Sequence, residues 1–166
     1  MTGDFAKLYD EEIGTIYGFF AYRARSRADA EELTQQTFER ALRAWSRFDP
    51  KRAPARVWLL AIARNLLTDH YRSDTSERLQ PLEKTSEHEM GSFLAKPDLG
   101  IDSKLAEALA VLARRDREIV ALRFGGDLNG PEIAAITGLS LANVQQILSR
   151  GLRKLREQLI ATESLR

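Results

Sequence analysis

The strongest constraint on the fold is the stretch NGPEIAAITGLSLANVQQILSRGLRKLR, which begins at Asn129 and is punctuated like two helices joined by a short turn. Asn129 can cap the first helix, Pro131 falls in its first turn, where no backbone amide is needed, and Glu132 completes an approximate capping box. Gly138 then makes the turn, and Ser140 can cap the longer second helix. This spacing predicts a helix-turn-helix, with a plain helical hairpin as the alternative. The basic second helix favours DNA binding.

The second helix of this pair divides into an apolar face and a polar face. The residues that helical spacing turns inward are Leu141, Val144, Leu148, Gly151 and Leu155. The outward candidates for contacts with bases and phosphates are Asn143, Gln145, Gln146, Ser149, Arg150 and Arg153. A glutamine can bond adenine bidentately, which gives about 1–3 kcal/mol of discrimination, whereas arginine can also hold a phosphate. We therefore predict a helix that depends more on base contacts than on phosphate attraction.

Helical periodicity also runs through most of the remaining chain. Apolar residues recur at three- and four-residue spacing over residues 5–20, 30–48, 55–71, 105–112 and 119–124. Pro50 ends the second of these runs, Gly125 stops the last, and Asp116 is the expected cap between the final two. No stretch alternates in the manner of a strand. The predicted fold class is therefore all-α.

The periodic pattern fails between residues 74 and 100, which are rich in Ser, Thr, Glu and Pro. This segment has 3 basic and 6 acidic side chains, whereas residues 1–73 have 12 and 10 and residues 101–166 have 10 and 8. We predict two small helical domains, at residues 1–73 and 101–166, joined by a flexible acidic linker at 74–100. A solvated tether explains the acidic composition as well as any binding role does.

Composition excludes several classes of function. The chain has no cysteine, and His70 and His88 lack the short spacing of a metal pair, so we expect no metal and no other cofactor. Nothing resembles a membrane span, and the N-terminus is too acidic for a secretion signal, which predicts a cytoplasmic protein without membrane insertion. No nucleophile, base or phosphate-binding loop has the spacing of a catalytic site, so we do not expect an enzyme.

Both halves of the chain resemble one family. DAEELTQQTFERALRAW and ARVWLLAIARNLLTDHYR in the first half, and the run from LAEALAVLARRDREIV to RGLRKLREQL in the second, are similar to regions two and four of bacterial extracytoplasmic-function (ECF) sigma factors. The resemblance covers nearly the whole chain. It implies a promoter-specificity subunit that binds core RNA polymerase and directs transcription initiation by reading minus-ten and minus-thirty-five elements. Such a protein associates with the nucleoid when it is active.

The resemblance also implies where polymerase binds. In the family, the helix equivalent to residues 30–48 docks on the clamp helices of the largest polymerase subunit, and the second domain meets the flap region. The candidate polymerase contacts carried over to this chain are Asp29, Glu32, Gln35 and Gln36. By composition alone, these polar residues fit a solvated helix face equally well.

For promoter melting, the family uses the loop before the third helix and the polar face of that helix. The minus-ten candidates here are Lys51, Arg52, Arg56, Arg64, Asn65, Asp69 and Arg72. Arginine and lysine can hold phosphates, while asparagine and aspartate can bond the edges of an unstacked base. Trp45, Phe48 and Trp58 have helical spacing, which predicts core packing rather than base stacking.

For the minus-thirty-five element, the resemblance points to the outward face of the second helix of the helix-turn-helix. The family often has a basic residue at the positions of Gln145, Ile147 and Leu152, which implies fewer phosphate contacts in this chain.

Two alternatives stay open at this point. A sigma mimic, or another helical interaction protein, would bind an anti-sigma factor without productive promoter binding. An ordinary helix-turn-helix repressor or activator would share the second half but has no use for the polar segments of the first. An anti-sigma factor is a candidate partner in the sigma reading as well, because the family is commonly restrained by one.

Overall fold

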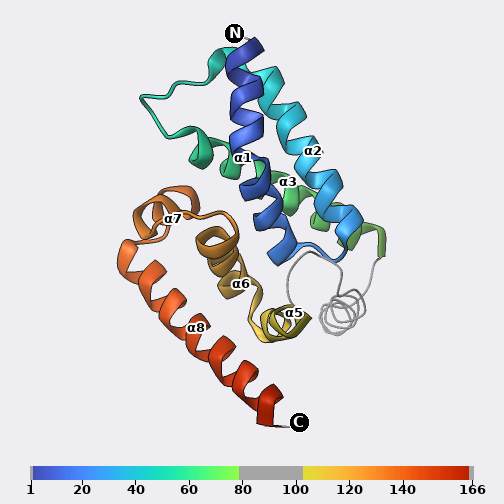
Figure 1. Cartoon of the computed structure of the whole chain (residues 1–166), viewed down its shortest axis with the longest axis vertical. Coiled ribbons are helices and arrows are strands. Elements are labelled where there is room, and N and C mark those ends of the chain that lie inside the picture. Colours follow the sequence, from blue (N-terminus) through green and yellow to red (C-terminus); the bar gives the residue numbers. More distant parts are fainter. Residues whose placement is uncertain (1, 79–102, 165–166) are drawn as a thin grey trace.

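The computed structural model describes residues 2–78 and 103–164, and these ranges are built from helices with no strand (Figure 1). The first helical unit comprises α1 (Thr2–Arg23), α2 (Arg27–Ala44), the short 3-10 helix η1 (Trp45–Arg47) and α3 (Ala55–Arg78). The second comprises α5 (Ser103–Val111), α6 (Arg114–Val120), the π-helical turn η2 (Ala121–Gly125), α7 (Gly130–Thr137) and α8 (Leu141–Ser164). The predicted all-α fold in two helical regions is confirmed.

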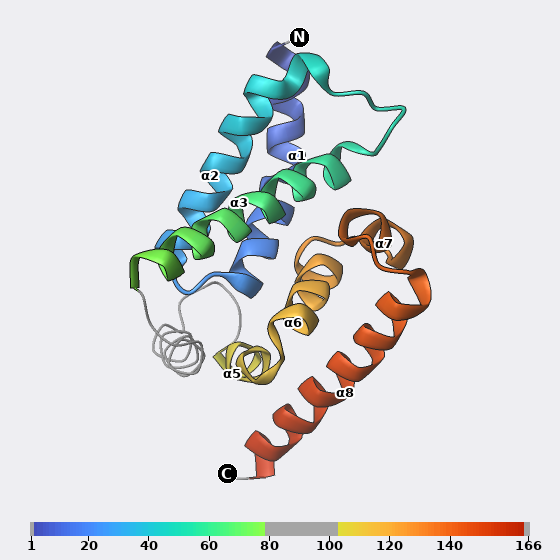
Figure 2. The same ribbon diagram turned by 180° about the vertical axis from the view of Figure 1, so that it is seen from behind.

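In the first unit, α1 and α2 run side by side in opposite directions, and α3 crosses both of them (Figures 1 and 2). Ser26 begins α2, where its hydroxyl oxygen accepts the backbone N–H of Asp29 at 3.1 Å. Between the three helices lies a core whose largest fully buried side chains are Ile16, Phe19, Phe20, Leu33, Leu59 and Leu60. Burial of these large apolar groups is what holds the unit together.

The third helix is longer than predicted. Periodicity ended at Tyr71, but the α3 backbone continues to Arg78 and so takes in the first residues of the expected linker. A helix that has already nucleated can propagate one hydrogen bond per residue without an apolar stripe, which explains the miss. The rest of the predicted linker, residues 79–100, lies outside the described residues.

The second unit contains the predicted helix-turn-helix. Asn129 accepts the N–H of Glu132 at 2.9 Å, and the Glu132 carboxylate accepts the N–H of Asn129 at 3.0 Å, which is a complete capping box. Gly138 ends α7 in the left-handed region at φ 76°, and Ser140 caps α8 by accepting the N–H of Asn143 at 3.1 Å. α8 lies along one side of the molecule and closes a core of Leu109, Ile119, Leu122 and Leu128.

The two units pack against each other along α1 and η2. Their closest approach is backbone to backbone, since a methyl group added at Gly125 would lie 2.6 Å from the carbonyl oxygen of Gly18. A methyl group at Gly18 would meet the carbonyl oxygen of Gly125 at 2.7 Å. One continuous cluster of buried apolar side chains extends through both units. Within the described residues, no helix is both long enough and apolar enough to cross a bilayer.

Candidate polymerase and nucleic-acid interfaces

The outward face of α8 carries the six predicted minus-thirty-five candidates. Asn143 is half-buried, and the other five, Gln145, Gln146, Ser149, Arg150 and Arg153, are exposed. The face is therefore continuous and polar over about three turns of helix. This face of α8 points to solvent because the capped helix α7 and the turn at Gly138 determine which side of α8 packs on the core.

The inward face of α8 differs from the prediction at three positions. Leu141 is 40% exposed, whereas Ile147 is 1% exposed and belongs to the core. Leu152 lines a groove beside Tyr22 and Phe124 rather than the polar face. Because Ile147 and Leu152 do not lie on the outward polar face, their lack of a positive charge removes nothing from that face. Of the three positions where the family often has a basic residue, only Gln145 lies on it. Leu148 is partly buried and packs against the core as predicted, and the buried stripe also takes in its neighbour Ile147, which the spacing did not single out.

Arg150 is held in place from within its own domain. Its Nε donates to Asp116 Oδ2 at 3.3 Å and its Nη2 donates to Asp116 Oδ1 at 3.1 Å, so the two groups pair edge to edge. The hydrogen bond to Asp116 and the charge of its carboxylate raise the pKa of Arg150. Asp116 was predicted as a helix cap, but it is 4% exposed inside α6, and Ala113 precedes that helix instead. A partner from α8 explains why a carboxylate is buried there.

The minus-ten candidates divide into two groups. Five of them are exposed, namely Lys51 and Arg52 in the loop before α3 and Asn65, Asp69 and Arg72 on α3. The loop is shaped by Asp49, whose carboxylate accepts the backbone N–H of Lys51 at 2.9 Å. These five groups are accessible to a nucleic acid in the structure as it stands.

The other two minus-ten candidates, Arg56 and Arg64, each pair with a carboxylate of the second unit, and Arg56 also pairs with Glu12 of the first. Arg56 donates to Glu12 at 2.8 Å and to Asp127 at 3.1 Å, and the bond to Glu12 is the main cause of its raised pKa. Arg64 Nε donates to Glu118 Oε1 at 2.6 Å. In the two pairs between the units, Asp127 is 71 residues from Arg56 along the chain and Glu118 is 54 residues from Arg64. Sequence reasoning had no means of finding them.

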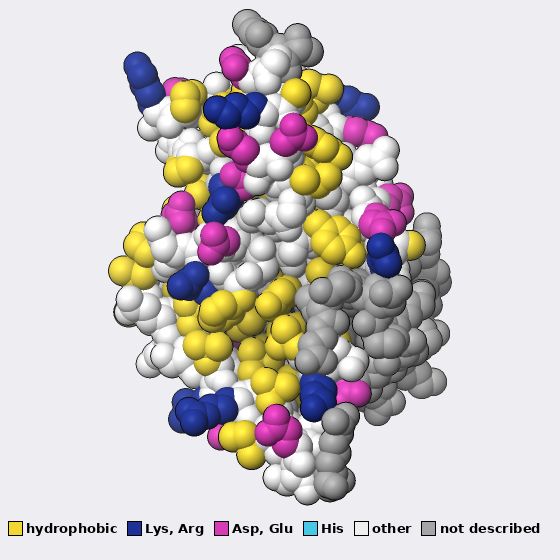
Figure 3. Space-filling view, viewed as in Figure 1, with side chains coloured by type: hydrophobic (Ala, Val, Ile, Leu, Met, Phe, Trp, Pro, Cys, Tyr) yellow, Lys and Arg dark blue, Asp and Glu magenta, His cyan; other side chains and the backbone are white. Residues whose placement is uncertain are grey.

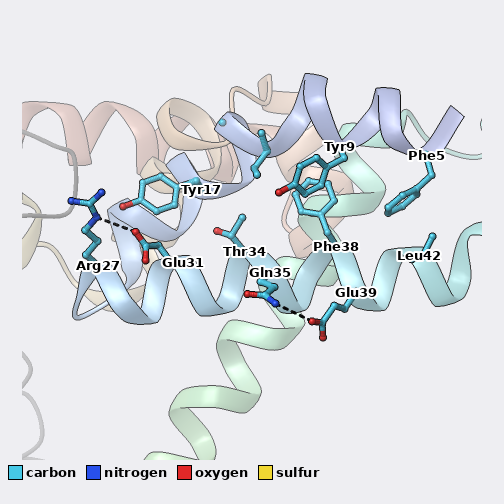
Figure 4. A pocket seen from close by; sticks show the side chains of 12 residues that line it. Phe5, Tyr9, Tyr17, Arg27, Glu31, Thr34, Gln35, Phe38, Glu39 and Leu42 are labelled. Carbon is cyan, nitrogen blue, oxygen red and sulfur yellow. Dashed lines mark hydrogen bonds and ion pairs between the residues drawn. The ribbon is translucent and has the colours of Figure 1, made fainter. Parts of the chain in front are cut away.

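The polymerase candidates lie in two rows on α2. Gln35 donates to Glu39 at 3.3 Å on the side that faces α1 (Figure 4). Gln36 donates to Glu32 at 3.1 Å on a neighbouring row of the helix. Asp29 continues toward α3, where its carboxylate lies 3.9 Å from His70 Nε2. The four residues therefore form a band around α2 rather than one line.

A groove of about 860 Å³ lies between α1 and α2, next to Gln35 (Figure 4). Its lining is mostly apolar and includes Tyr9 and Phe38, whose rings meet edge to face at 4.8 Å, and Leu42, which is 53% exposed. Glu31 and Glu39 stand on the α2 side of this groove. Tyr9 lies in the periodic apolar run predicted over residues 5–20, and the sequence pattern did not single out Leu42. The sequence signal for the groove was Leu42 itself, an apolar residue that lies outside the apolar stripe of its helix.

A second apolar surface lies on the other unit. Figure 3 shows hydrophobic side chains gathered over α5, η2 and α8, and a groove of about 570 Å³ is lined there by Phe124, Leu152 and Ile160, all of them exposed. Trp45, Phe48 and Trp58 form a third feature at the end of α2. They are half-buried and stack on each other, with Phe48 and Trp58 ring centres 4.7 Å apart, so the prediction that they would be core residues holds only in part.

These features define a class of helical DNA-binding protein. A helix-turn-helix unit is joined to a second unit, whose helix α2 carries a band of acidic and amide side chains beside an apolar groove. The Sigma-70 region 2 model matches residues 8–77, and the Sigma-70 region 4 model matches residues 108–157. The chain belongs to the ECF sigma factors of RNA polymerase. It is therefore a promoter-specificity subunit, which binds core RNA polymerase and directs transcription initiation.

Several curated relatives are named RNA polymerase sigma factors. The ECF sigma factor BldN of Streptomyces coelicolor is 32% identical over 160 residues, a match that covers 91% of this chain but 58% of BldN. The RNA polymerase sigma-E factor of the same organism is 31% identical, and the match covers 81% of this chain and 74% of the sigma-E chain. The sigma factor CnrH of Cupriavidus metallidurans is 30% identical, with 76% and 71% covered.

Two solved structures have a similar fold. CnrH in complex with the cytosolic domain of CnrY superposes with a TM-score of 0.69 at 24% identity and covers 97% of this chain and 90% of that chain. RpoE in complex with the anti-sigma factor NepR from Bartonella quintana superposes with a TM-score of 0.76 at 21% identity and covers 94% and 96%. At these identities the likeness concerns the fold alone.

Proposed function

We propose that α8 reads the minus-thirty-five element of a promoter through Asn143, Gln145, Gln146, Ser149, Arg150 and Arg153. The observation that carries this proposal is the continuous polar face of α8, which the helix-turn-helix presents to solvent. Because Asp116 engages Nε and Nη2 of Arg150, that guanidinium offers DNA its remaining N–H donors. The two glutamines are free of this restraint and are the candidates for direct base contacts.

The minus-ten strand binds, in this proposal, to the loop before α3 and to the polar face of that helix. Lys51, Arg52 and Arg72 are exposed cations for phosphates, and Asn65 and Asp69 offer hydrogen bonds to a base. Arg56 and Arg64 join them only after their pairs with the second unit break. Full promoter melting therefore requires the two units to move apart.

Core polymerase docks on α2 and the groove beside it. The clamp helices of the largest polymerase subunit contact Asp29, Glu32, Gln35 and Gln36, and an apolar side chain of the clamp enters the groove that Tyr9 and Leu42 line. The acidic rim of this surface suits a basic partner helix. The apolar surface around Phe124 and Ile160 takes the flap region in the same way, since exposed apolar patches of this kind mark interaction sites.

Each segment predicted from the sequence has a role in this proposal. Residues 1–73 dock on polymerase and bind the minus-ten element, residues 74–100 form an acidic linker, and residues 101–166 recognise the minus-thirty-five element. An anti-sigma factor is a further partner in this proposal. CnrH is solved with the cytosolic domain of CnrY, and RpoE with the anti-sigma factor NepR, and both share the fold of this chain.

Transcription in vitro tests the proposed promoter reading. The purified chain is added to core polymerase of its source bacterium on fragmented genomic DNA, and RNA 5′ ends are mapped. We expect discrete starts that share two upstream motifs. Tight core binding without any starts would contradict promoter reading, and the absence of both would favour a sigma mimic.

A charge reversal tests the docking surface. We expect Glu32→Lys to weaken core polymerase binding at least tenfold, because it places a cation in the acidic band. Glu11→Lys is the matched control, since it makes the same charge change at an exposed position of α1 outside that band. Equal affinities for the two variants would refute the docking surface.

A further inference from the structure

An exposed leucine stands at the start of the reading helix. Leu141 is the first residue of α8, and 40% of it is exposed to solvent. Two other large apolar residues of α8 that are exposed, Leu152 and Ile160, line the groove beside Phe124. Leu141 lies instead at the helix-turn-helix end of α8, where the outward polar face begins. Its exposure therefore calls for an explanation of its own.

The side chain of Leu141 packs on the start of α7. A methyl group added at Gly130, the first residue of α7, would lie 2.9 Å from Leu141 Cδ1. Ser140 caps α8 from the preceding position by accepting the N–H of Asn143 at 3.1 Å. The leucine is therefore held between two capped helix starts, and an additional contact costs it little further side-chain entropy.

The first turn of α8 presents uncharged side chains to solvent. Ala142 follows Leu141, is exposed, and is small enough to let the edge of a base approach. No acidic residue lies in this turn, and the first basic residue of the helix is Arg150. Uncharged side chains attract phosphates weakly, which favours contact with base edges at this end of α8.

Leu141 also shares a side of the helix with Gln145. Residues four apart are neighbours on a helix surface, and both side chains are exposed. Four residues advance a helix by about 6 Å, and stacked base pairs are about 3.4 Å apart. For a helix that lies along the major groove, Leu141 therefore reaches a base pair about two steps from the one that Gln145 reaches.

We propose that Leu141 is a specificity-determining residue that contacts the C5-methyl group of a thymine in the minus-thirty-five element. The four bases present one methyl group in the major groove, that of thymine, and an apolar side chain is the contact that suits it. Cytosine lacks this methyl group, so the contact favours thymine over cytosine at that position. The inference rests on the proposed function, because it takes α8 as the helix that reads the promoter.

The test uses holoenzyme made from the full chain and core polymerase, on a promoter mapped by transcription in vitro. Each thymine of the minus-thirty-five element, on either strand, is replaced in turn by deoxyuridine, which keeps the hydrogen-bonding groups and lacks only the methyl group. We expect holoenzyme affinity to fall about fourfold at one thymine, which corresponds to one methyl group left in water. Leu141→Ala should abolish this difference between thymine and uracil.

Val111→Ala is the matched control, because it trims an exposed apolar side chain of the same unit on α5. This variant should keep the full sensitivity to deoxyuridine. Two results would overturn the inference, namely a wild-type affinity that no deoxyuridine changes and a Leu141→Ala variant as sensitive as the wild type. Since each variant is compared with itself on two DNA duplexes, a change in its stability does not alter the readout.

Failure of the proposed function is a separate outcome of the same assay. If replacing Gln146 and Arg150 with alanine leaves promoter binding unchanged, α8 is not the reading helix, and both proposals are refuted. If those replacements impair binding but removal of each methyl group has no effect, α8 reads the promoter and only the role of Leu141 is refuted.

Discussion

The two surfaces proposed for promoter DNA differ in how they are held. On α8, Arg150 pairs with Asp116 of its own unit, and the rest of the polar face is open to solvent. On α3, Arg64 pairs with Glu118 of the other unit, and Arg56 divides its bonds between Glu12 and Asp127. The minus-thirty-five surface is therefore preformed, whereas part of the minus-ten surface is available only when the units separate.

This difference also indicates what holds the units together. The ion pairs of Arg56 and Arg64 are one-third exposed on the arginine side, and pairs of that kind contribute about 0–1 kcal/mol each. The close contact of Gly18 with Gly125 and the shared apolar core contribute more, because they remove surface from water. Four changes test the comparison, beginning with the one that should have the largest effect.

Replacing both Gln146 and Arg150 with alanine removes the centre of the preformed surface. A bidentate base contact of Gln146 is worth about 1–3 kcal/mol and the loss of Arg150 adds to it, so we expect promoter affinity to fall at least tenfold while core polymerase binding is unchanged. Transcription from a mapped promoter and a direct core-binding assay measure the two quantities. Gln158→Ala, at an exposed position of α8 beyond the proposed reading face, is the control. Undiminished promoter output from the double variant would place the recognition surface elsewhere.

Gly125→Ala should disrupt the close backbone contact between the two units. The added methyl group would lie 2.6 Å from the Gly18 carbonyl oxygen, and overpacking of this kind costs about 1–3 kcal/mol. We expect a lower free energy of unfolding in urea and a larger radius of gyration by X-ray scattering. Gly14→Ala is the matched control, because a methyl group there meets nothing within 4 Å and alanine favours the helix by about 0.5–1 kcal/mol. An unchanged radius for Gly125→Ala would argue that the units are not closed in solution.

Asp116→Asn tests whether Arg150 is positioned by its carboxylate partner. A buried asparagine pairs less well with the guanidinium, so we expect minus-thirty-five affinity to fall by about 1 kcal/mol. A double-mutant cycle with Arg150→Ala isolates the interaction, since the Asp116 effect should disappear when Arg150 is absent. Additive losses in that cycle would mean that Asp116 acts on stability alone.

Glu118→Gln should have the smallest effect. It removes the charge that holds Arg64 and should weaken the packing of the units by about 0.5–1 kcal/mol, an effect that high salt reduces. We expect slightly faster promoter opening, measured by permanganate footprinting, because Arg64 is released for DNA. Glu107→Gln, at an exposed position of α5, is the control. Slower opening would show that the pair assists melting instead of opposing it.

Features that depend on neighbours in the chain were predictable. The capping box of Asn129 and Glu132, the left-handed turn at Gly138 and the cap at Ser140 all use hydrogen bonds between residues three or four positions apart. The all-helical fold and the outward face of α8 follow from spacing within single helices. The same local reasoning missed the burial of Ile147, which lies in the core beside the partly buried Leu148.

The amino-acid pattern was enough to predict the set of helices, the helix-turn-helix with its outward polar face, and the family that these features indicate. The folded structure was needed to find that Asp116 pairs with Arg150, that Glu118 and Asp127 pair with Arg64 and Arg56, and that Tyr9 and Leu42 line an exposed groove. The difference comes from distance along the chain. Capping and periodicity are set by bonds between near neighbours, whereas burial and ion pairing depend on groups that only folding brings together.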